Sequence, residues 1–533
     1  MRKILLCISL LAGTFANSFS QETEDDRPKL VIGIVIDQMK FDYLKEFWND
    51  YSHRGFKRLI QEGVNFTQTH YSYKPTYTGP GHATIFTGRT PKDHGIVGNN
   101  WFDRSNRKVV YCATHEVNGD IAHTPERLKS STFSDYIKKE QNNRSKSIGV
   151  SLKDRGAILP AGHLADAAYW FDGEKGQFRS SEFYKAQNQS ILKAFNEQQN
   201  IDAYFSGIWS LSKDSSAYQE SEDDHLNYKI PFGEGDLETL PYDLKNLKKM
   251  KGFDALKSIP QGNEMLADFA KIITVEEQLG KRGFMDFLSV SFSATDYVGH
   301  RFGAQAIEVQ DTYLKLDKTI ADFIDFLDTQ IGRDKYLLFL SSDHGASMPR
   351  SYLSRNGISN GFLDQAYYEE KIDSICDSHL GDENWIDKVI NLNIYFNEKW
   401  MTVNAKMREQ TLNEITKWLE DQKGIKLVLN TKEIISNTNS LLSKAIEGSC
   451  LPRSGDLILI EEKNWTAYSD KGSTHGSPYA YDTHVPFILF GNGLAGQSVD
   501  IPLRVADISP IVGNLVSIKM GNLKCKFSNF QKK

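Results

Sequence analysis

The chain has 533 residues, 40% of them hydrophobic and 25% charged, which is typical of a globular protein with one large domain or two to three smaller ones. Its 63 Lys and Arg and 69 Asp and Glu give a formal net charge of -6, and no basic run stands out. This balance argues against nucleic acid as a principal partner.

The first twenty residues have the pattern of a secretory signal peptide. "MRK" is a basic start, Ile4 to about Ala16 is apolar, and small residues lead to Ser20. The apolar stretch is too short to span a membrane in the mature protein, and an acidic "QETEDD" follows it. We therefore expect cleavage after residues 1–20, a mature chain that starts near Gln21, and export to the periplasm or the medium. The alternative is a buried N-terminal strand or helix.

Five apolar runs that end in polar residues predict strands of a buried sheet: 29–37, 147–155, 287–296, 336–345 and 484–493. Amphipathic segments such as 309–327 lie between them. Alternating strands and helices predict an α/β protein with a mostly parallel central sheet flanked by helices.

Two polar stretches rich in Tyr, Asn and Lys interrupt this alternation, at about 173–262 and 348–464. We interpret them as insertions that form cap regions within one catalytic domain, 21–533. Four cysteines remain in the mature chain and fit neither a zinc knuckle nor a CxxC pair: Cys112, Cys376, Cys450 and Cys525. In an oxidising compartment they allow one or two disulfides, and the sequence does not select the pairing. The tail after about residue 521 matches no motif.

Polar residues lie where the predicted strands end. Asp37, Asp296 and the adjacent pair Asp343 and His344 each follow a buried apolar run. The carboxyl edge of an open α/β sheet is where ligands bind. One Asp in such a position is more often a helix N-cap, so the repetition at several strand ends is what indicates a site.

Two further histidines complete a set of metal ligands. His300 shares a face with Asp296 if the chain turns helically between them, and His475 lies in a glycine-flanked loop before a strand. Three Asp and three His without a thiolate favour zinc, with manganese or cobalt as alternatives. Six ligands suit two ions with open positions. We interpret the other histidines as structural, with His82 and His484 best placed to support a ligand.

The segment "TYTGPGHATIFTG", 76–88, places Thr78 at the expected start of a helix. A helix N-terminus offers free N–H groups and positive potential to an anion. Gly79 and Gly81 would let the backbone approach a tetrahedral group closely. Thr78 alone would be interpreted as an N-cap, but beside the metal set it is a candidate nucleophile.

Seven motifs in order resemble the alkaline phosphatase superfamily, in its type I phosphodiesterase/nucleotide pyrophosphatase branch, and most of all the phosphate-irrepressible phosphatases of the PafA type. They cover nearly the whole mature chain: "VIDQM", "YKPTYTGPGHATIFTG", "HGIVGNNW", "SLKDRGAILPAGH", "DYVGHRFG", "SSDHG" and "THGSPYAYDTHVP".

The resemblance implies two zinc ions, one held by Asp296, His300 and His475, the other by Asp37, Asp343 and His344, with Thr78 on the second as nucleophile. It implies that Asn99 contacts a phosphoryl oxygen. Lys153 and Arg155 of "SLKDR" match the pair that distinguishes phosphomonoesterases from phosphodiesterases in this branch. A monoester dianion needs this additional countercharge.

The implied function is an exported monomeric alkaline phosphatase that hydrolyses small phosphate monoesters with broad specificity through a phosphothreonine. A phosphodiesterase or nucleotide pyrophosphatase is the alternative, which Lys153 and Arg155 disfavour. A sulfatase would need C/S-x-P-x-R, whereas "CLPRS" at 450–454 has its Arg one position early. An inactive exported binding protein would have lost a ligand, and none is missing.

Overall fold

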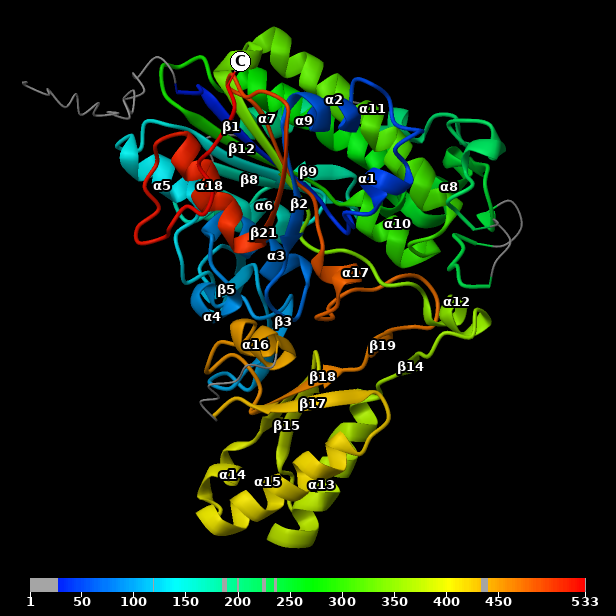
Figure 1. The fold of residues 1–533 in the computed structure, drawn as a ribbon, viewed down its shortest axis with the longest axis vertical. Coiled ribbons are helices and arrows are strands. Elements are labelled where there is room, and N and C mark those ends of the chain that lie inside the picture. The colour runs from blue at the N-terminus through cyan, green and yellow to red at the C-terminus, as the bar shows by residue number, and fades with distance from the viewer. Residues whose placement is uncertain are drawn as a thin grey trace, which may run out of the picture.

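The computed structural model describes residues 27–117, 119–184, 189–198, 201–222, 227–233, 237–432 and 440–532. The expected signal peptide lies outside these ranges. Figure 1 shows a large body around a twisted sheet and a smaller second body below it. None of the helices in the described ranges combines the length and the apolar character needed to cross a lipid bilayer.

The large body is built on a nine-stranded sheet with the order β21-β2-β20-β13-β1-β12-β7-β8-β9. Its strands are β1 Leu30–Ile36, β2 Val64–His70, β7 Ser147–Ser151, β8 Ala167–Asp172, β9 Gln177–Arg179, β12 Asp286–Phe292, β13 Tyr336–Ser341, β20 Phe487–Gly491 and β21 Gln497–Arg504. Neighbours pair in parallel except around β20 and β9. The predicted α/β fold with a mostly parallel central sheet is confirmed.

Helices cover both faces of this sheet, which is why its central strands β1, β12, β13 and β20 are buried along their whole length. The helices of the large body are α1 Tyr43–Glu46, α2 Phe56–Glu62, α3 Thr78–Thr87, α4 Pro91–His94, α5 Phe133–Glu140, α6 Asp154–Ala161, α7 Gln189–Gln198, α8 Leu244–Lys251, α9 Gln261–Glu276, α10 Ala294–Phe302, α11 Ile307–Gln330, α17 Ala480–Thr483 and α18 Ile508–Leu515. The helix expected at 309–327 is α11.

Strand β1 illustrates how the two faces are filled. Ile32, Ile34 and Ile36 pack with α9 and α11 in one apolar cluster, whereas Val31 and Val35 pack with α3, α5 and α18 in another. All five side chains are buried, and each contributes roughly 1.5–3 kcal/mol by leaving water. Between them, a Cβ on the glycine of β1 would lie 2.6 Å from Phe339 and 2.8 Å from Phe86, so only glycine lets α3 pack this closely.

Most of the stretch 348–464 forms the second body, which has its own four-stranded sheet β15-β16-β18-β17. Its elements are β14 Gly361–Phe362, α13 Gln365–Leu380, β15 Ile386–Ile390, β16 Asn393–Phe396, α14 Glu398–Thr402, α15 Ala405–Glu420, β17 Ile425–Asn430, α16 Ser440–Glu447, β18 Leu457–Glu461 and β19 Trp465–Thr466. Helix α12 Arg350–Arg355 precedes them and packs Tyr352 against the core of the large body. Strands β14 and β19 pair in parallel and make the neck between the bodies (Figure 1). That 348–464 is an insertion within one catalytic domain stays a prediction.

The other polar stretch, 173–262, packs against the large body. It contains β9, α7, α8 and a small ribbon of β10 Ile208–Trp209 and β11 Tyr242–Asp243, and its apolar side chains join the cluster beneath α9. Two more hairpins precede it in the chain, β3 Asn100–Asp103 with β4 Lys108–Tyr111 and β5 Thr114–Val117 with β6 Asp120–His123.

The four cysteines of the described chain are free thiols, so none of the pairings that the composition allowed is formed. The tail after residue 521 lies along the sheet: Phe527 packs edge-on against Phe66 with ring centroids 5.3 Å apart, and Lys532 bridges to Leu494.

Candidate metal centre

The predicted site residues meet at one edge of the large sheet. Strands β13, β1, β12 and β7 are neighbours that run in the same direction, so their carboxyl ends lie side by side. The residues that follow these ends are Asp343 and His344, Asp37, Asp296, and Lys153 with Arg155. Strand β2 runs the same way and leads through 71–77 to Thr78, the first residue of α3. The topology therefore collects segments that are hundreds of residues apart in sequence.

Asp37, Asp343 and His344 form a compact buried cluster whose candidate ligand atoms all lie within 4.8 Å of one another. His344 Nε2 is 3.5 Å from Asp37 Oδ1 and 3.5 Å from Asp343 Oδ2. Both of these carboxylate oxygens are buried and accept no hydrogen bond from any described residue. A buried, unpaired carboxylate oxygen is costly, so the pair fits a cation that both oxygens would bind.

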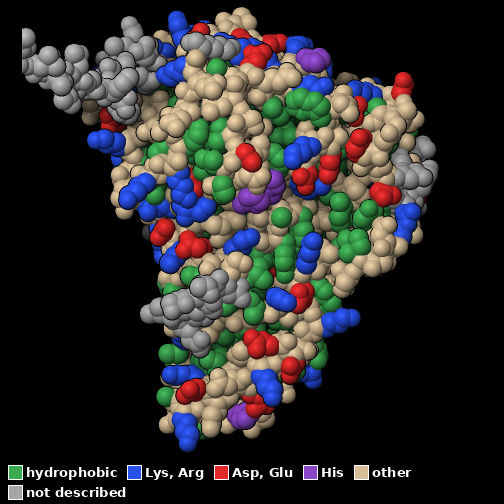
Figure 2. Space-filling model, viewed as in Figure 1, with side chains coloured by type: hydrophobic (Ala, Val, Ile, Leu, Met, Phe, Trp, Pro, Cys, Tyr) green, Lys and Arg blue, Asp and Glu red, His purple; other side chains and the backbone are tan. Residues whose placement is uncertain are grey.

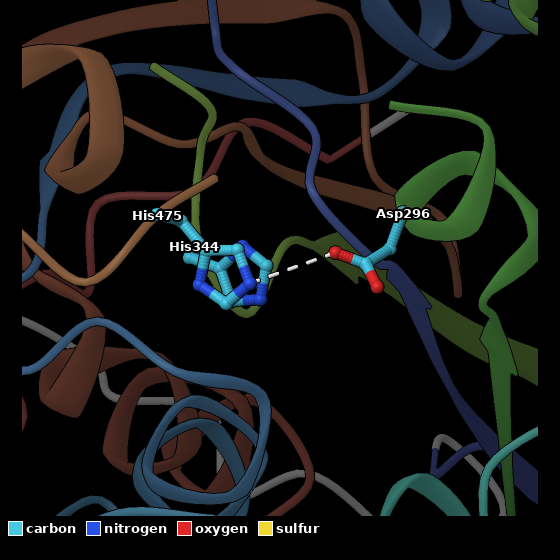
Figure 3. Close-up of side chains that lie close together, drawn as sticks. All are labelled: Asp296, His344 and His475. Carbon is cyan, nitrogen blue, oxygen red and sulfur yellow. Dashed lines mark ion pairs between the residues drawn. The ribbon is translucent and has the colours of Figure 1, made fainter. Parts of the chain in front are cut away.

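A second cluster consists of Asp296, His344 and His475. Figure 3 shows the two imidazoles stacked beside the carboxylate. Their ring centroids are 3.4 Å apart, and His475 Nε2 is 3.7 Å from Asp296 Oδ1. His300 Nε2 approaches the same oxygen to 3.2 Å. Asp296, His300 and His475, which the resemblance assigns to one zinc, therefore lie close together. The most compact group around Asp296 nevertheless contains His344 in place of His300, and His344 also belongs to the cluster of Asp37 and Asp343.

The three histidines share a tautomer that suits metal binding. Each places Nδ1 against a backbone carbonyl: His300 on Ser473 at 2.7 Å, His344 on Gly345 at 3.1 Å and His475 on Thr76 at 2.7 Å. A carbonyl only accepts, so Nδ1 carries a proton in each ring and Nε2 is the nitrogen that remains for a metal. Burial lowers the pKa of His300, but Asp296 outweighs burial and raises it, so Nε2 of His300 would release a proton when a metal binds. Burial also lowers the pKa of His344 to about 3, which keeps that ring neutral. Neutral imidazoles oriented by carbonyls are the form that binds zinc.

Thr78 is buried at the N-terminus of α3, where its hydroxyl faces the first cluster. Thr78 Oγ1 lies 3.4 Å from His344 Nε2. The next N–H of the helix, from Gly79, donates to Asn99 Oδ1 at 2.7 Å, which orients the Asn99 amide beside the threonine. A Cβ on Gly81 would lie 2.2 Å from the carbonyl oxygen of Asp343, so glycine is required for the helix to reach the cluster.

Lys153 and Arg155 supply two fixed positive charges. Lys153 Nζ donates to Asp37 Oδ2 and to Asp296 Oδ2, both at 2.6 Å, and so bridges the two clusters. Burial lowers the pKa of Lys153, but Asp296 and Asp37 outweigh burial and hold the pKa above its ordinary value. Arg155 donates from Nη2 to Thr78 Oγ1 at 3.5 Å. Only Arg155 of the pair therefore contacts the candidate nucleophile, while Lys153 contacts the candidate ligands.

Two supporting residues contact these groups. Gln38, in the left-handed region with φ 65°, donates from Nε2 to Asp296 Oδ1 at 2.7 Å and from its backbone N–H to Asp343 Oδ1 at 3.2 Å. The Tyr111 hydroxyl accepts from Arg155 at 3.2 Å. The pattern analysis overlooked both: Gln38 could have been noticed from its place beside Asp37, whereas Tyr111 has no sequence signal.

Of the two histidines expected to support a ligand, only His82 contacts one. His82 Nδ1 is 3.4 Å from Asp343 Oδ2, and burial lowers the pKa of His82 to about 4. His484 instead stacks on His70, with ring centroids 4.2 Å apart, and bonds to the carbonyl of Thr67.

A cavity of about 330 Å³ opens beside the metal centre, between the two bodies. Asn99, His300 and His475 form part of its wall. Figure 2 shows that Lys and Arg are mixed with Asp and Glu over the visible face of both bodies, without a large field of one sign.

Comparison with known proteins agrees with this geometry. Residues 31–485 match the family described as type I phosphodiesterase / nucleotide pyrophosphatase. The chain is 34% identical to the alkaline phosphatase PafA of Elizabethkingia meningoseptica, covering 97% of this chain and 96% of that protein. It is 36% identical to the alkaline phosphatase PhoV of Synechococcus elongatus, covering 97% of both. It is also 36% identical to a protein of Myroides odoratus named calcium-transporting ATPase, covering 96% of this chain and 95% of that one.

The crystal structure of wild-type PafA superposes with a TM-score of 0.86 over 93% of this chain and 96% of that one, at 34% identity. A PafA variant with one threonine, one asparagine, one lysine and one arginine replaced gives a TM-score of 0.85 at 33% identity, with the same coverage. The extent of these matches leaves one family: the chain belongs to the type I phosphodiesterase/nucleotide pyrophosphatase family of the alkaline phosphatase superfamily.

Proposed function

We propose that this protein is an exported, metal-dependent alkaline phosphatase that hydrolyses small phosphate monoesters with broad specificity. The observation that carries the proposal is the meeting, at one sheet edge, of two Asp/His clusters, a buried threonine hydroxyl and two fixed cations. Relatives that cover nearly the whole chain are named alkaline phosphatases. The resemblance in fold supports the same assignment.

Two zinc ions fit the donor set. Asp37, Asp343 and His344 would hold one, and Asp296, His300 and His475 the other. The unpaired oxygens of Asp37 and Asp343 support this choice, and so do the histidine Nε2 atoms, which all face carboxylates of the site. Bound there, the ions would supply positive charge that lowers the pKa of a hydroxyl and balances the charge of the phosphate.

The remaining steps belong to side chains of this chain. Thr78 would lose its hydroxyl proton to solvent and attack phosphorus, since its hydroxyl is fixed at the helix start 3.4 Å from His344 Nε2. The bond from phosphorus to the ester oxygen would break, and the alcohol would leave with a proton from water. Arg155, which already donates toward that hydroxyl, would donate to a phosphoryl oxygen as charge builds up on it. Asn99 would donate from its NH2 group to a second phosphoryl oxygen, because its carbonyl oxygen is held by Gly79. Water would then attack phosphorus from the side that the alcohol has left, which releases phosphate and restores Thr78.

The charge of the site favours monoesters over diesters. A monoester dianion has one more negative charge than a diester, and a charge-assisted hydrogen bond contributes roughly 1.5–3 kcal/mol. Lys153 would act mainly by setting the charge and spacing of Asp37 and Asp296, which it bridges. Hydrolysis of a terminal phosphate of ATP uses the same dianionic group, so the name of the Myroides relative is compatible with this chemistry.

The test is a steady-state comparison of phenyl phosphate, diphenyl phosphate and phenyl sulfate on the zinc-loaded mature protein. We expect the highest kcat/KM for the monoester. A higher value for the diester would assign a phosphodiesterase, and no turnover of any ester by protein that has bound zinc would assign a binding protein.

We also propose that the protein is exported after cleavage of residues 1–20 and that it is a monomer. The motivation is the N-terminal pattern of residues 1–20, with its basic start and apolar stretch. N-terminal sequencing of protein from the periplasm should begin near Gln21, and its mass in solution should be that of one chain. An uncleaved N-terminus on the exported protein would contradict this part.

A further inference from the structure

Most of the wall of the cavity beside the metal centre comes from parts of the chain that the proposed chemistry does not use. It has a volume of about 330 Å³, and the second body and its neck supply much of its wall. Trp465 of β19, Tyr468 beyond it and Tyr77 of the large body all lie on that wall. A wall shared by two bodies beside reacting groups is a common place for a small-molecule site.

The geometry of phosphoryl transfer places the leaving alcohol on the side of the cavity. In phosphoryl transfer the attacking and leaving oxygens lie roughly in line on opposite sides of phosphorus. Thr78 attacks from the side of His344, Asp37 and Asp343. The opposite side is the one with Asp296 and His300, and His300 and His475 line the cavity. The alcohol of the ester would therefore occupy the cavity.

The wall of the cavity offers aromatic surfaces. The Tyr468 ring lies 5.4 Å from the ring of His300, and the Tyr77 ring lies edge-on to His475 at 5.6 Å. Trp465 packs against Gly361 of the neck and Gly424 of the second body, where a Cβ on either glycine would collide with its ring. All three aromatic side chains are half-buried, so each keeps an exposed surface.

Two of the charged side chains on the wall of the cavity neutralise each other. Lys74 and Glu461, both on the wall, form a buried ion pair with each other. A ring system with polar atoms fits such a wall, because the aromatic side chains can stack on it and the Lys74–Glu461 pair adds little net charge.

We propose that this cavity is a leaving-group subsite that selects phosphate monoesters whose alcohol carries an aromatic or heteroaromatic ring. The inference rests on the proposed phosphatase function. It narrows broad specificity to a graded preference: small alkyl phosphates are turned over, and ring-bearing ones are turned over faster because the ring packs against Tyr468 and its neighbours.

The test compares adenosine 5′-monophosphate with ribose 5-phosphate, which have the same kind of primary-alcohol leaving group and differ in the base. One good aromatic contact corresponds to about a tenfold difference in kcat/KM. We expect a ratio of about ten or more for the wild-type protein. Tyr468→Leu should bring the ratio close to one, Tyr468→Phe should keep it, and Tyr367→Ala, on the exposed side of α13, should change neither rate.

The outcomes separate the two proposals. Hydrolysis of both esters with a ratio near one in the wild type, or a ratio that Tyr468→Leu leaves unchanged, refutes the subsite alone. Zinc content should be equal in all variants, and loss of zinc from Tyr468→Leu but not from Tyr468→Phe refutes the assignment of Tyr468 to leaving-group binding. No hydrolysis of either ester by zinc-loaded protein refutes the phosphatase function and the subsite with it.

Discussion

The segment that precedes Thr78 is tied to the second body by a buried ion pair, and breaking that pair is our most quantitative prediction. Lys74 Nζ pairs with Glu461 at the end of β18, and the two side chains are 3% and 5% exposed. Lys74 Nζ also donates to the carbonyl of Leu459 at 2.8 Å. Two residues later the carbonyl of Thr76 accepts from His475. The pair therefore holds the approach to both the nucleophile and a candidate ligand.

Glu461→Gln would leave the Lys74 ammonium buried without its countercharge. Removing one partner of a buried pair costs about 3–5 kcal/mol, since the remaining charge stays desolvated. The neighbouring pair Lys426–Glu462 provides a matched control, because its atoms are 3.2 Å apart but its side chains are 48% and 41% exposed. An exposed pair of this kind contributes about 0–1 kcal/mol.

Urea-induced unfolding, followed by tryptophan fluorescence, measures the difference. We expect Glu461→Gln to lower the free energy of unfolding by about 3–5 kcal/mol and Glu462→Gln by less than about 1 kcal/mol. Lys74→Met combined with Glu461→Leu should recover most of the loss, because two apolar side chains of similar size leave no unpaired charge. An equal effect of the two single Gln variants would refute the reasoning, and so would a double variant as unstable as Glu461→Gln.

Three further predictions concern the metal centre. Prolonged chelation should abolish phosphatase activity and zinc should restore it, and full activity of protein shown to be metal-free would contradict the assignment. Thr78→Ala should lower kcat by several orders of magnitude and keep about two zinc ions per chain; wild-type turnover would exclude Thr78 as the nucleophile. Arg155→Ala should lower kcat/KM for a monoester about 10–100-fold and for a diester much less, and equal losses would remove the main physical support for monoester selectivity.

The central sheet could be predicted from sequence because its strands are apolar on both faces. The run at β1 is seven residues long and entirely buried, which leaves no competing pattern. The same property made the polar residues at the strand ends visible, so Asp37, Asp343 and His344 could be assigned to one edge before their distances were known.

The second body was harder to predict because its pattern is local and mixed. Strand β15, "IDKVI", has only two fully buried residues in five, and β17 has only two in six. Strands of this kind gain their stability from cross-strand partners far away in the chain, as where Ile394 of β16 pairs with Leu457 of β18. The sequence therefore predicts a polar insertion but not the four-stranded sheet inside it.

Within the site, contacts between side chains far apart in the sequence could not be predicted. The place of Lys153 between Asp37 and Asp296 depends on the order of β1, β12 and β7, which no single segment encodes. Tyr111 reaches Arg155 only because the hairpin of β3 and β4 folds over the edge of the sheet. The residue types at the strand ends predict which residues form the site, whereas their mutual contacts depend on the order of the strands in the sheet.

The stereochemical course at phosphorus tests the central claim most directly. Transfer from an isotopically chiral phosphate monoester to an acceptor alcohol should proceed with net retention, because attack by Thr78 and attack on the phosphothreonine each invert the phosphorus once. Net inversion would mean that the acceptor attacks the substrate in a single displacement, and would contradict the account of Thr78 as the nucleophile.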